Sequence, residues 1–353
     1  YNRQTLLPEI GEMGQEKMLQ SKVLIVGVGG LGSAILPYLV GAGVGEIGII
    51  DEDVISISNL QRQVIYKTDS VGKSKVLEAK SMALSLNPNV KINAIEEKLN
   101  SKNVLQLFPY YDIIIDATDN LNTKYLINDA CCVLNKPFVY GSVFRFEGQV
   151  SVFNYNNGPT YRCLFPEQDA QSLNCNDAGV LGISVGIIGM LQANEVLKMI
   201  LQLGEVLNGK LLVYNILNSE QQKFSFDKNV KNSIDLQAFE SKYNNESTSP
   251  EIDFAQILKH IDQDNFLFVD VRNVDEQPKL NFKNAIQIPL QQLETELDKI
   301  DANKEVFVYC QSGVRSLNAI AILQKHQFNN VKSIIGGAVK INEVLESKSQ
   351  LIS

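Results

Sequence analysis

Two short loops of this chain carry residues that could do chemistry. The glycine loop, residues 27–32, reads Gly-Val-Gly-Gly-Leu-Gly and directly follows the apolar run 22–26. The Cys310 loop, residues 310–315, reads Cys-Gln-Ser-Gly-Val-Arg and directly follows the apolar run 306–309. The first pattern is typical of a loop that binds nucleotide phosphates, and the second of a loop that holds a reactive sulfur anion. Their presence on one chain indicates that ATP energy is used to move sulfur.

The glycine loop fits a nucleotide because of where its glycines lie. Gly27 permits a tight turn, Gly29 lets the backbone approach a phosphate, and Gly32 lets the next helix pack on the strand. Gly30 belongs to the same phosphate-binding backbone, and the helix N-terminus adds free N–H groups. Asp51 ends the next expected strand, where an acid accepts ribose hydroxyls. Alone, this predicts a nucleotide, with NAD as the default.

Residues after Asp51 favour a triphosphate instead. Arg62 and Lys75 supply cations, which attack at an α-phosphorus requires for the charge of its transition state. Asp119 follows another apolar strand and offers a carboxylate for magnesium. Each cation alone could be an ordinary surface residue, and Asp119 alone could cap a helix. Their combination and order make chance a poor explanation.

The Cys310 loop has a different chemistry. Successive amide groups between Cys310 and the following helix can form an anion-binding nest, and Arg315 adds positive charge. Such surroundings favour a thiolate and stabilise a terminal persulfide on Cys310. We therefore predict that Cys310 and Arg315 are catalytic.

Size and composition set limits on these predictions. The 353 residues suggest about two domains, and 44% apolar residues suffice for packed cores. A net charge of -8 without a dense basic block argues against nucleic acid as a ligand. Five cysteines, an odd number, indicate reduced cytoplasmic thiols. The first residues form no apolar signal segment, and the apolar stretch 178–191 is shorter than a membrane span, so we expect a soluble protein without membrane contact.

The elements that must position the two loops follow an α/β pattern. We expect strands at 23–26, 47–50, 91–95, 112–116 and 138–140, and helices at 31–41, 73–87 and 123–134. A β-rich stretch at 148–155, a loop at 167–174, an apolar helix at 180–201 and strands at 211–215 and 222–226 complete the first domain. The glycines within that helix fit either core burial or a subunit interface.

The polar segment 227–250 is interpreted as a linker. Beyond it, we expect strands at 266–271, 285–288, 306–309 and 331–335 and a helix at 316–326.

Residues 1–226 resemble the MoeB/ThiF family of ubiquitin-activating-enzyme-like adenylyltransferases, a Rossmann-like fold. The matching strings are 1–4, 27–32, 51–53, 58–63, 71–75, 117–120, 146–149 and 177–180. The resemblance implies that Mg-ATP adenylates the C-terminal glycine of a small ubiquitin-fold sulfur carrier ending in Gly-Gly. It implies that the nucleotide is bound by Arg3, Gly27, Gly29, Gly30, Gly32, Asp51, Asp53, Asn59, Arg62, Gln63, Lys75, Asp119 and Asn120. Asp51 would hold the ribose, Asn59, Arg62 and Lys75 the phosphates, and Asp119 the magnesium. Arg3 would reach the ATP of the other subunit of a homodimer.

The other cysteines bear on the same resemblance. Family members commonly hold a structural zinc on two Cys-x-x-Cys pairs, but here only Cys163 occupies such a position. We therefore expect no zinc site and a leftover buried thiol. Cys175 precedes the apolar helix and, by the resemblance, either bonds to the activated partner or resolves an acyl disulfide. Its alternative is a partly buried thiol. Cys131 and Cys132 lie in an apolar run and are expected in the core.

Residues 251–353 resemble a single rhodanese domain, on the strings 270–272, 285–290, 310–315 and 336–337. Asn284 replaces a usual Gly, Gln287 stands where His is frequent, and no Trp follows Gly337. The resemblance implies that a cysteine desulfurase or thiosulfate loads Cys310. Its persulfide would then displace AMP, reaching the adenylate through the long linker.

The sulfur could serve molybdopterin, thiamine or tRNA thiolation, and the rhodanese fusion favours molybdopterin. Two other classes stay open. An NAD-dependent oxidoreductase would explain the glycine loop but not Arg62, Lys75 and Asp119. A non-catalytic scaffold, with an inactive rhodanese fold as its binding module, would leave the reactive residues unexplained.

Overall fold

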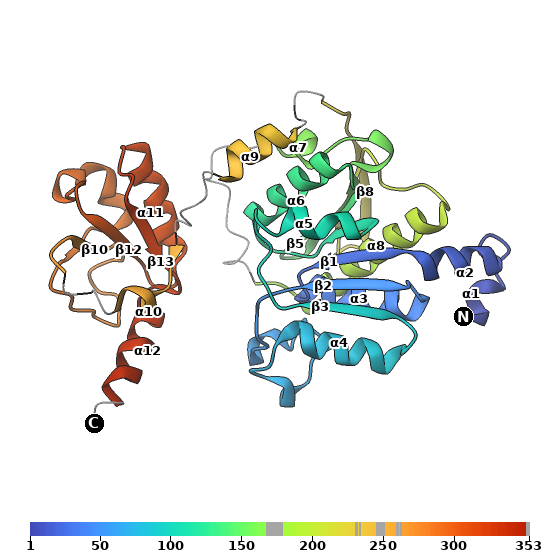
Figure 1. Cartoon of the computed structure of the whole chain (residues 1–353), viewed down its shortest axis with the longest axis horizontal. Helices are drawn as coiled ribbons and strands as arrows, with labels where there is room; N and C mark the ends of the chain where they lie inside the picture. Colours follow the sequence, from blue (N-terminus) through green and yellow to red (C-terminus); the bar gives the residue numbers. More distant parts are fainter. Residues whose placement is uncertain are drawn as a thin grey trace. The chain divides into compact units, whose positions relative to one another are not determined.

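The strand–helix alternation expected of residues 22–140 is present in the computed structural model, which describes residues 1–166, 179–229, 232, 234–244, 251–258, 261 and 263–350. The chain divides into two units, Tyr1–Tyr243 and Asn244–Ser353 (Figure 1). Each unit is an α/β structure built on its own sheet, which confirms the predicted fold class.

The first unit is organised around one twisted sheet. In the part of the chain that is described, its strand order is β3-β2-β1-β4-β5-β6-β7-β8. The first five strands in that order are parallel, and β6, β7 and β8 continue the sheet antiparallel. The strands are β1 (Lys22–Val26), β2 (Glu46–Ile50), β3 (Lys91–Ile95), β4 (Ile113–Asp116), β5 (Phe138–Phe144), β6 (Glu147–Phe153), β7 (Lys210–Asn215) and β8 (Glu220–Ser225).

Helices cover both faces of this sheet because its strand residues alternate between two cores. Val23 and Ile25 share one core with α3, α4 and α8, whereas Leu24 and Val26 share the other with α5, α6 and α9. The helices are α1 (Asn2–Thr5), α2 (Gly11–Gln20), α3 (Gly30–Ala42), α4 (Lys75–Leu86), α5 (Val104–Leu107), α6 (Leu121–Leu134), α7 (Tyr161–Leu164), α8 (Gly182–Leu201) and α9 (Leu236–Asn244). Such a doubly covered parallel sheet places its ligand site at the carboxyl ends of the strands.

Helix α8 is long and apolar enough to cross a membrane by length and composition alone. Half of its most apolar window is nevertheless buried inside the protein, and the helix packs on α3, β5 and β6. We therefore assign α8 to the core of the first unit, where Val185 and Ile188 contribute to the packing.

The segment 227–250, expected to be a linker, contains helix α9. Phe239 and Tyr243 of α9 are buried in the core that also contains Val26. Because the segment is mostly polar, its composition did not indicate a helix. The two aromatic residues lie four positions apart and therefore share one face of that helix. Residues 245–250 lie outside the described part of the chain.

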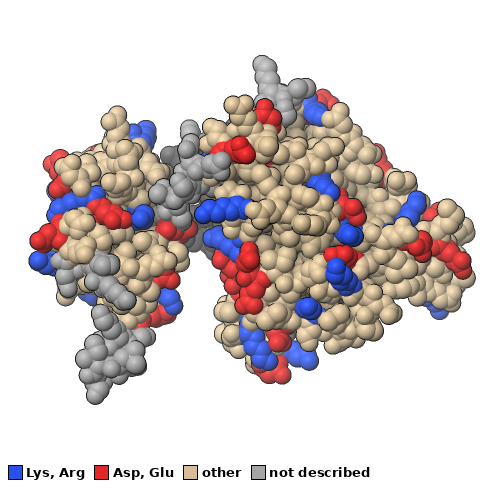
Figure 2. Space-filling view, in the orientation of Figure 1, with Lys and Arg blue, Asp and Glu red and all other residues tan. Residues whose placement is uncertain are grey.

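The second unit has a smaller sheet of parallel strands in the order β11-β10-β12-β13-β9. They are β9 (Glu251–Ile252), β10 (Phe266–Asp270), β11 (Ala285–Gln287), β12 (Glu305–Tyr309) and β13 (Val331–Ile334). The helices are α10 (Phe254–Ile257), α11 (Val314–Lys325) and α12 (Gly337–Gln350). Apolar residues on both faces of the central strands pack in two cores, so the ends of β10 and β12 are rigid supports for the loops that follow them. Figure 2 shows acidic and basic side chains interspersed over the face in view.

Candidate functional site

The glycine loop connects β1 to α3 as expected. Gly27 has a φ of +91°, a conformation that favours glycine, and a Cβ on Gly32 would lie 2.2 Å from the Gly27 carbonyl oxygen. A Cβ on Gly30 would lie 2.5 Å from a methyl group of Val185 in α8. Helix α3 begins at Gly30 with Gly29 as its N-cap, so its first amide groups face the loop. The loop therefore offers a backbone anion site that tolerates no side chains at these positions.

Asp51 follows β2, and its carboxylate accepts a hydrogen bond from the backbone of the glycine loop. Its Oδ2 accepts the N–H of Val28 at 2.9 Å, and its Oδ1 accepts the N–H of Asp53 at 2.9 Å. Burial raises the pKa of Asp51, while Lys75 and the two amide groups act against that shift. The carboxylate is thus fixed beside the glycine loop, where the predicted ribose contact requires it.

Lys75 is the buried cation of the site. It begins α4, is 5% exposed, and donates from Nζ to Oδ2 of Asp53 at 2.6 Å. The Asp53 side chain is 62% exposed, so the pair joins a buried cation to a solvated anion. Asp53 therefore positions Lys75, and its expected contact with the nucleotide stays a prediction.

The crossover after Asp51 brings Arg62 and Gln63 onto the glycine loop. Cδ of Arg62 lies 3.7 Å from the Cβ position of Gly30, and its Nη1 donates to the carbonyl of Ser58 at 3.2 Å. Gln63 is 3% exposed and lies 3.5 Å from the Cβ position of Gly29. Its Oε1 has no hydrogen-bond partner among the described residues. An unpartnered buried amide beside an anion-binding loop is a group that a ligand can satisfy.

Asn59 shapes the turn that carries Arg62. Its Oδ1 accepts the N–H of Ser56 at 3.0 Å, and its own N–H and carbonyl bond within the same turn. This leaves the Nδ2 N–H groups of Asn59 as the donors for its predicted phosphate contact, which stays a prediction.

Asp119 lies on the connection from β4 to α6 with an exposed carboxylate. The helix-capping role that could have occupied it falls to Asn120, whose side chain accepts the N–H of Thr123 at 2.9 Å. Asn120 therefore uses its amide oxygen to begin α6, and its expected contact with the nucleotide stays a prediction.

A buried ion pair that the sequence reasoning missed supports this connection. Nζ of Lys124 donates to Oδ2 of Asp116 at 2.8 Å, to the Thr118 carbonyl at 2.8 Å and to the Gly141 carbonyl at 3.0 Å. Oδ1 of Asp116 accepts from both the N–H and the hydroxyl of Thr118. Lys124 ties the end of β4 and the middle of β5 to the Asp119 connection. The available signal was an acid ending an apolar strand with a lysine eight residues later.

A cavity of about 220 Å³ opens beside the carboxyl ends of β2 and β3. Its lining mixes apolar and polar side chains: Ile50, Ile95, Glu97, Asn103, Gln106, Leu107 and Tyr110. It adjoins Asp51 through Ile50, so it lies next to the predicted ribose position. No motif in the sequence marks it.

Arg3, a further predicted residue, is not brought into this site. Arg3 is exposed on α1, and its expected contact with a second subunit stays a prediction. Cys175, with the expected loop 167–174, lies outside the described residues.

The one cysteine that lies where the family's zinc is expected already accepts hydrogen bonds from the backbone. Sγ of Cys163, which is half-buried rather than buried, accepts the N–H of Asn229 at 3.2 Å and that of Thr160 at 3.4 Å. One thiol beside a threonine hydroxyl is no zinc donor set, and no cluster of three metal-ligating side chains occurs in the described ranges. Arg162, next to Cys163, stabilises the same region through two hydrogen bonds to buried Asp129, at 2.7 and 2.6 Å. The residues therefore do not fit zinc.

Cys131 and Cys132 differ in exposure but are both inert by their surroundings. Cys131 is fully buried and Cys132 half-buried. Burial raises the pKa of the Cys131 thiol and raises that of Cys132 to about 12.

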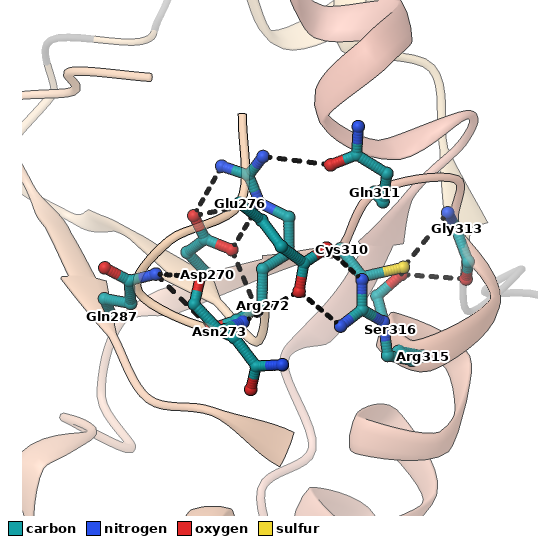
Figure 3. A network of polar contacts seen from close by, with 10 residues as sticks. All are labelled: Asp270, Arg272, Asn273, Glu276, Gln287, Cys310, Gln311, Gly313, Arg315 and Ser316. Carbon is teal, nitrogen blue, oxygen red and sulfur yellow. Dashed lines mark hydrogen bonds and ion pairs between the residues drawn. The ribbon is translucent and has the colours of Figure 1, made fainter. Parts of the chain in front are cut away.

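The Cys310 loop joins β12 to α11 in the second unit. Cys310 is 1% exposed, and its Sγ accepts the N–H of Gly313 at 3.1 Å. Gly313 has a φ of +100° and is the N-cap of α11, which turns the amide toward the sulfur. Oγ of Ser316 lies 3.7 Å from the sulfur and donates to the Gly313 carbonyl (Figure 3). The loop thus stabilises a sulfur anion with backbone dipoles.

Both arginines beside this loop are paired with carboxylates. Arg315 donates to Oε1 and Oε2 of Glu276 at 2.7 and 2.5 Å, and Arg272 to Asp270 at 2.7 and 2.9 Å. The Arg315 hydrogen bonds lower the pKa of Glu276 to about 2. Glu276 in turn raises the pKa of Arg315, to which Cys310 adds a smaller contribution. Glu276 and Arg272 were not among the predicted site residues.

Comparison with known proteins finds relatives of both units. A model of the ThiF family matches residues 1–234, and one of the rhodanese-like domain matches residues 253–343. The adenylyltransferase and sulfurtransferase MOCS3 of Arabidopsis thaliana is 35% identical, over 96% of this chain and 82% of that protein.

Two further comparisons concern the first unit. The sulfur carrier protein adenylyltransferase of Thermus thermophilus is 42% identical over 65% of this chain and 88% of its own length. The solved structure of E. coli MccB with ATP has a TM-score of 0.56 at 23% identity, covering 61% of this chain and 66% of that chain. That likeness shows the fold of the first unit.

Proposed function

The chain belongs to the ThiF family and ends in a rhodanese-like domain, and on this premise we propose that it activates and thiolates a sulfur carrier. ATP is used to adenylate the C-terminal glycine of a small ubiquitin-fold protein ending in Gly-Gly. The AMP is then replaced by sulfur carried on Cys310. The relatives named for adenylyltransferase and sulfurtransferase activities support this reading.

The observation that carries the proposal is the occurrence of two anion cradles on one chain. One is the glycine loop with Lys75 and Arg62 beside it, and the other is the amide loop around Cys310. An NAD-dependent oxidoreductase needs neither the paired cations nor the second cradle. A binding scaffold needs no sulfur held by an amide.

The first reaction joins the carrier to AMP. The terminal carboxylate attacks the α-phosphorus, and pyrophosphate leaves with the bonding electron pair. Lys75 and Arg62 compensate the negative charge that grows on the phosphates. Asp51 holds the ribose, and the cavity beside Ile50 takes the adenine, since it combines apolar walls with amide and hydroxyl groups.

Magnesium fits the exposed Asp119 carboxylate, because this ion favours one or two carboxylates together with substrate phosphates. Bound there, it would supply further charge compensation at the phosphates.

The second reaction moves the sulfur. The terminal sulfur of the Cys310 persulfide attacks the acyl carbon, and AMP leaves to give an acyl disulfide. Reductive cleavage of that disulfide, by Cys175 acting as a second thiol, releases the thiocarboxylate and leaves a Cys175–Cys310 disulfide to be reduced. Arg3 completes the ATP site of a second subunit in a homodimer. A cysteine desulfurase or thiosulfate supplies the sulfur, and the free thiols of the described cysteines fit the cytoplasm.

Intact mass spectrometry tests this function. Candidate ubiquitin-fold proteins ending in Gly-Gly are incubated with the protein, Mg-ATP and a sulfur donor. We expect one carrier to exchange oxygen for sulfur, and the Cys310→Ala variant to form the acyl-adenylate without that exchange. NADH in place of ATP is the control for the oxidoreductase reading. Absence of both products with every carrier would contradict the proposal. The identity of the carrier that reacts separates the molybdopterin, thiamine and tRNA pathways.

A further inference from the structure

The charges around Cys310 are balanced pair by pair. Arg315, at the start of α11, donates from Nη1 and Nη2 to the two oxygens of Glu276, and Arg272 donates from Nε and Nη2 to the two oxygens of Asp270. Arg272 also donates to Oε1 of Gln311, the residue that follows the cysteine, at 3.1 Å. Each guanidinium beside the loop therefore has a carboxylate of its own, and the net charge of the two pairs is close to zero.

Besides Arg315, whose charge Glu276 balances, the sulfur is stabilised by groups without net charge. The Gly313 amide at 3.1 Å and the N-terminus of α11 supply the positive potential, and the Ser316 hydroxyl lies nearby (Figure 3). Figure 3 shows the Glu276 carboxylate between Arg315 and the Arg272–Asp270 pair. Arg315 keeps N–H groups that can donate to a bound sulfur atom, because Glu276 occupies only two of its five.

Two classes of donor place different charges in this loop. With thiosulfate, the Cys310 thiolate attacks the outer sulfur, the S–S bond breaks, and sulfite leaves with the electron pair; the complex carries three negative charges. With a protonated persulfide, R–S–SH, the thiolate attacks the terminal sulfur and R–S⁻ leaves; the complex carries one. Both reactions leave one added sulfur on Cys310. An unpaired arginine would favour the first donor far more than the second.

We propose that Glu276 sets the sulfur-donor specificity of the Cys310 loop by neutralising Arg315. It disfavours small sulfur-bearing dianions such as thiosulfate and leaves the loop fitted to a donor that presents its sulfur as a persulfide. Glu276 comes from the connection after β10, 39 residues before Arg315, so its role is set by the tertiary fold. This inference rests on the proposed role of Cys310 and deepens it by naming the class of donor.

The test measures sulfur loading of Cys310 without ATP or carrier. Wild-type and Glu276→Gln proteins are mixed with thiosulfate or with an uncharged alkyl persulfide, that of N-acetylcysteamine, and the loading rate is followed by intact mass. The glutamine keeps an oxygen acceptor for the Asn273 N–H, which Glu276 binds at 2.9 Å. Asp275→Asn is the matched control, since this exposed neighbour carries the same charge and makes no ion pair in the described residues.

We expect Glu276→Gln to raise the second-order rate constant for thiosulfate roughly tenfold at low salt, and the gain to shrink as salt is added. The rate with the uncharged persulfide should change by less than about threefold. Glu276→Asp, which retains the charge, should behave as wild type toward thiosulfate.

Three results would overturn the proposal: equal loss of rate with both donors, an equal gain in Asp275→Asn, or no change in Glu276→Gln. Equal loss would make Glu276 a residue that only positions Arg315. If Cys310 accepts sulfur from neither donor in the wild-type protein, the proposed sulfur-transfer function fails instead. Adenylation, measured separately as pyrophosphate exchange, is independent of all these outcomes.

Discussion

The glycine loop of the first unit and the Cys310 loop of the second share a local plan. Each follows a buried parallel strand, contains a glycine with positive φ (Gly27 at +91°, Gly313 at +100°), and leads into the N-terminus of a helix. The two sites differ in their side-chain charges. Among the described residues, Arg62 makes no ion pair and Lys75 is bound to a largely solvated carboxylate, whereas Arg315 and Arg272 are each neutralised by a carboxylate that accepts two hydrogen bonds.

This difference shows how one backbone device can serve two kinds of anion. The strand–glycine–helix arrangement supplies a cradle of N–H groups in both units. The carboxylates brought in by the tertiary structure then decide how much net positive charge surrounds it. A polyphosphate needs that charge, and a monoanionic sulfur atom does not.

Cys310→Ala is expected to have the largest effect. It removes the sulfur carrier atom, so thiolation of the carrier should fall below detection, while pyrophosphate exchange should stay within about twofold of wild type because the two sites belong to separate units. Both activities are measured on one preparation. Cys163→Ser is the control thiol variant and should retain both. Loss of pyrophosphate exchange in Cys310→Ala would contradict the independence of the sites.

Lys75→Ala and Arg62→Ala should each slow adenylation by roughly 10²–10³-fold, because each removes a charge that stabilises the transition state. Sulfur loading of Cys310 should not change. The control is Lys73→Ala, an exposed lysine two residues from Lys75 that pairs with Glu78. Single-turnover formation of the acyl-adenylate is the measurement. A similar loss in Lys73→Ala would show that general surface charge, rather than these two cations, drives the reaction.

Asp51→Asn should raise the KM for ATP roughly tenfold with a smaller change in kcat. The asparagine offers one acceptor where the carboxylate binds two amide groups, so the glycine loop and the ribose compete for it. Initial-rate kinetics with varied ATP provide the test. An unchanged KM would remove Asp51 from the nucleotide site.

The ion pair of the Cys310 loop predicts a pH effect on stability. The pKa of Glu276 lies at about 2 in the folded protein, below the ordinary glutamate value of 4.5. A carboxyl with a lowered folded-state pKa stabilises the fold above its unfolded pKa, and the contribution is lost as the pH falls from about 4.5 toward 2. Since the pair is partly solvated, we expect Glu276→Gln to lower the free energy of unfolding of the second unit by about 1–2 kcal/mol at pH 7.

That difference between wild type and Glu276→Gln should shrink at pH 3. Denaturant unfolding at both pH values, followed by a probe in the second unit, is the measurement, and Asp275→Asn is the control. A stability difference that is constant with pH would show that packing rather than charge holds Glu276 in place.

The smallest effect is expected at Cys163, whose sulfur also accepts a backbone N–H, from Asn229 at 3.2 Å. Substituting Cys163 therefore tests whether a hydrogen bond from a backbone amide, as at Cys310, is enough to make a thiol functional. Cys163→Ser should cost no more than about 1 kcal/mol of stability and change neither reaction. A metal chelator should leave the Tm of the protein unchanged, since the Cys163 surroundings do not form a zinc donor set. A chelator-induced fall in Tm would contradict this reading of the lobe.

Local spacing determined much of this protein from the sequence alone. The positions of the glycine loop, Asp51 and the Cys310 loop each depend on a strand followed by a turn and a helix, and those elements are encoded within about 20 residues. The same local signals gave the α/β fold class of both units. The sequence did not predict helix α9, because Phe239 and Tyr243 are the main sign of burial in an otherwise polar segment.

Contacts between distant segments decided the rest. Asp53 holds Lys75 across 22 residues, and Glu276 holds Arg315 across 39. The sequence therefore located the reactive atoms, because their loops are local. Only the tertiary structure set the charge around them, because an ion pair depends on side chains that the fold brings within a few ångströms.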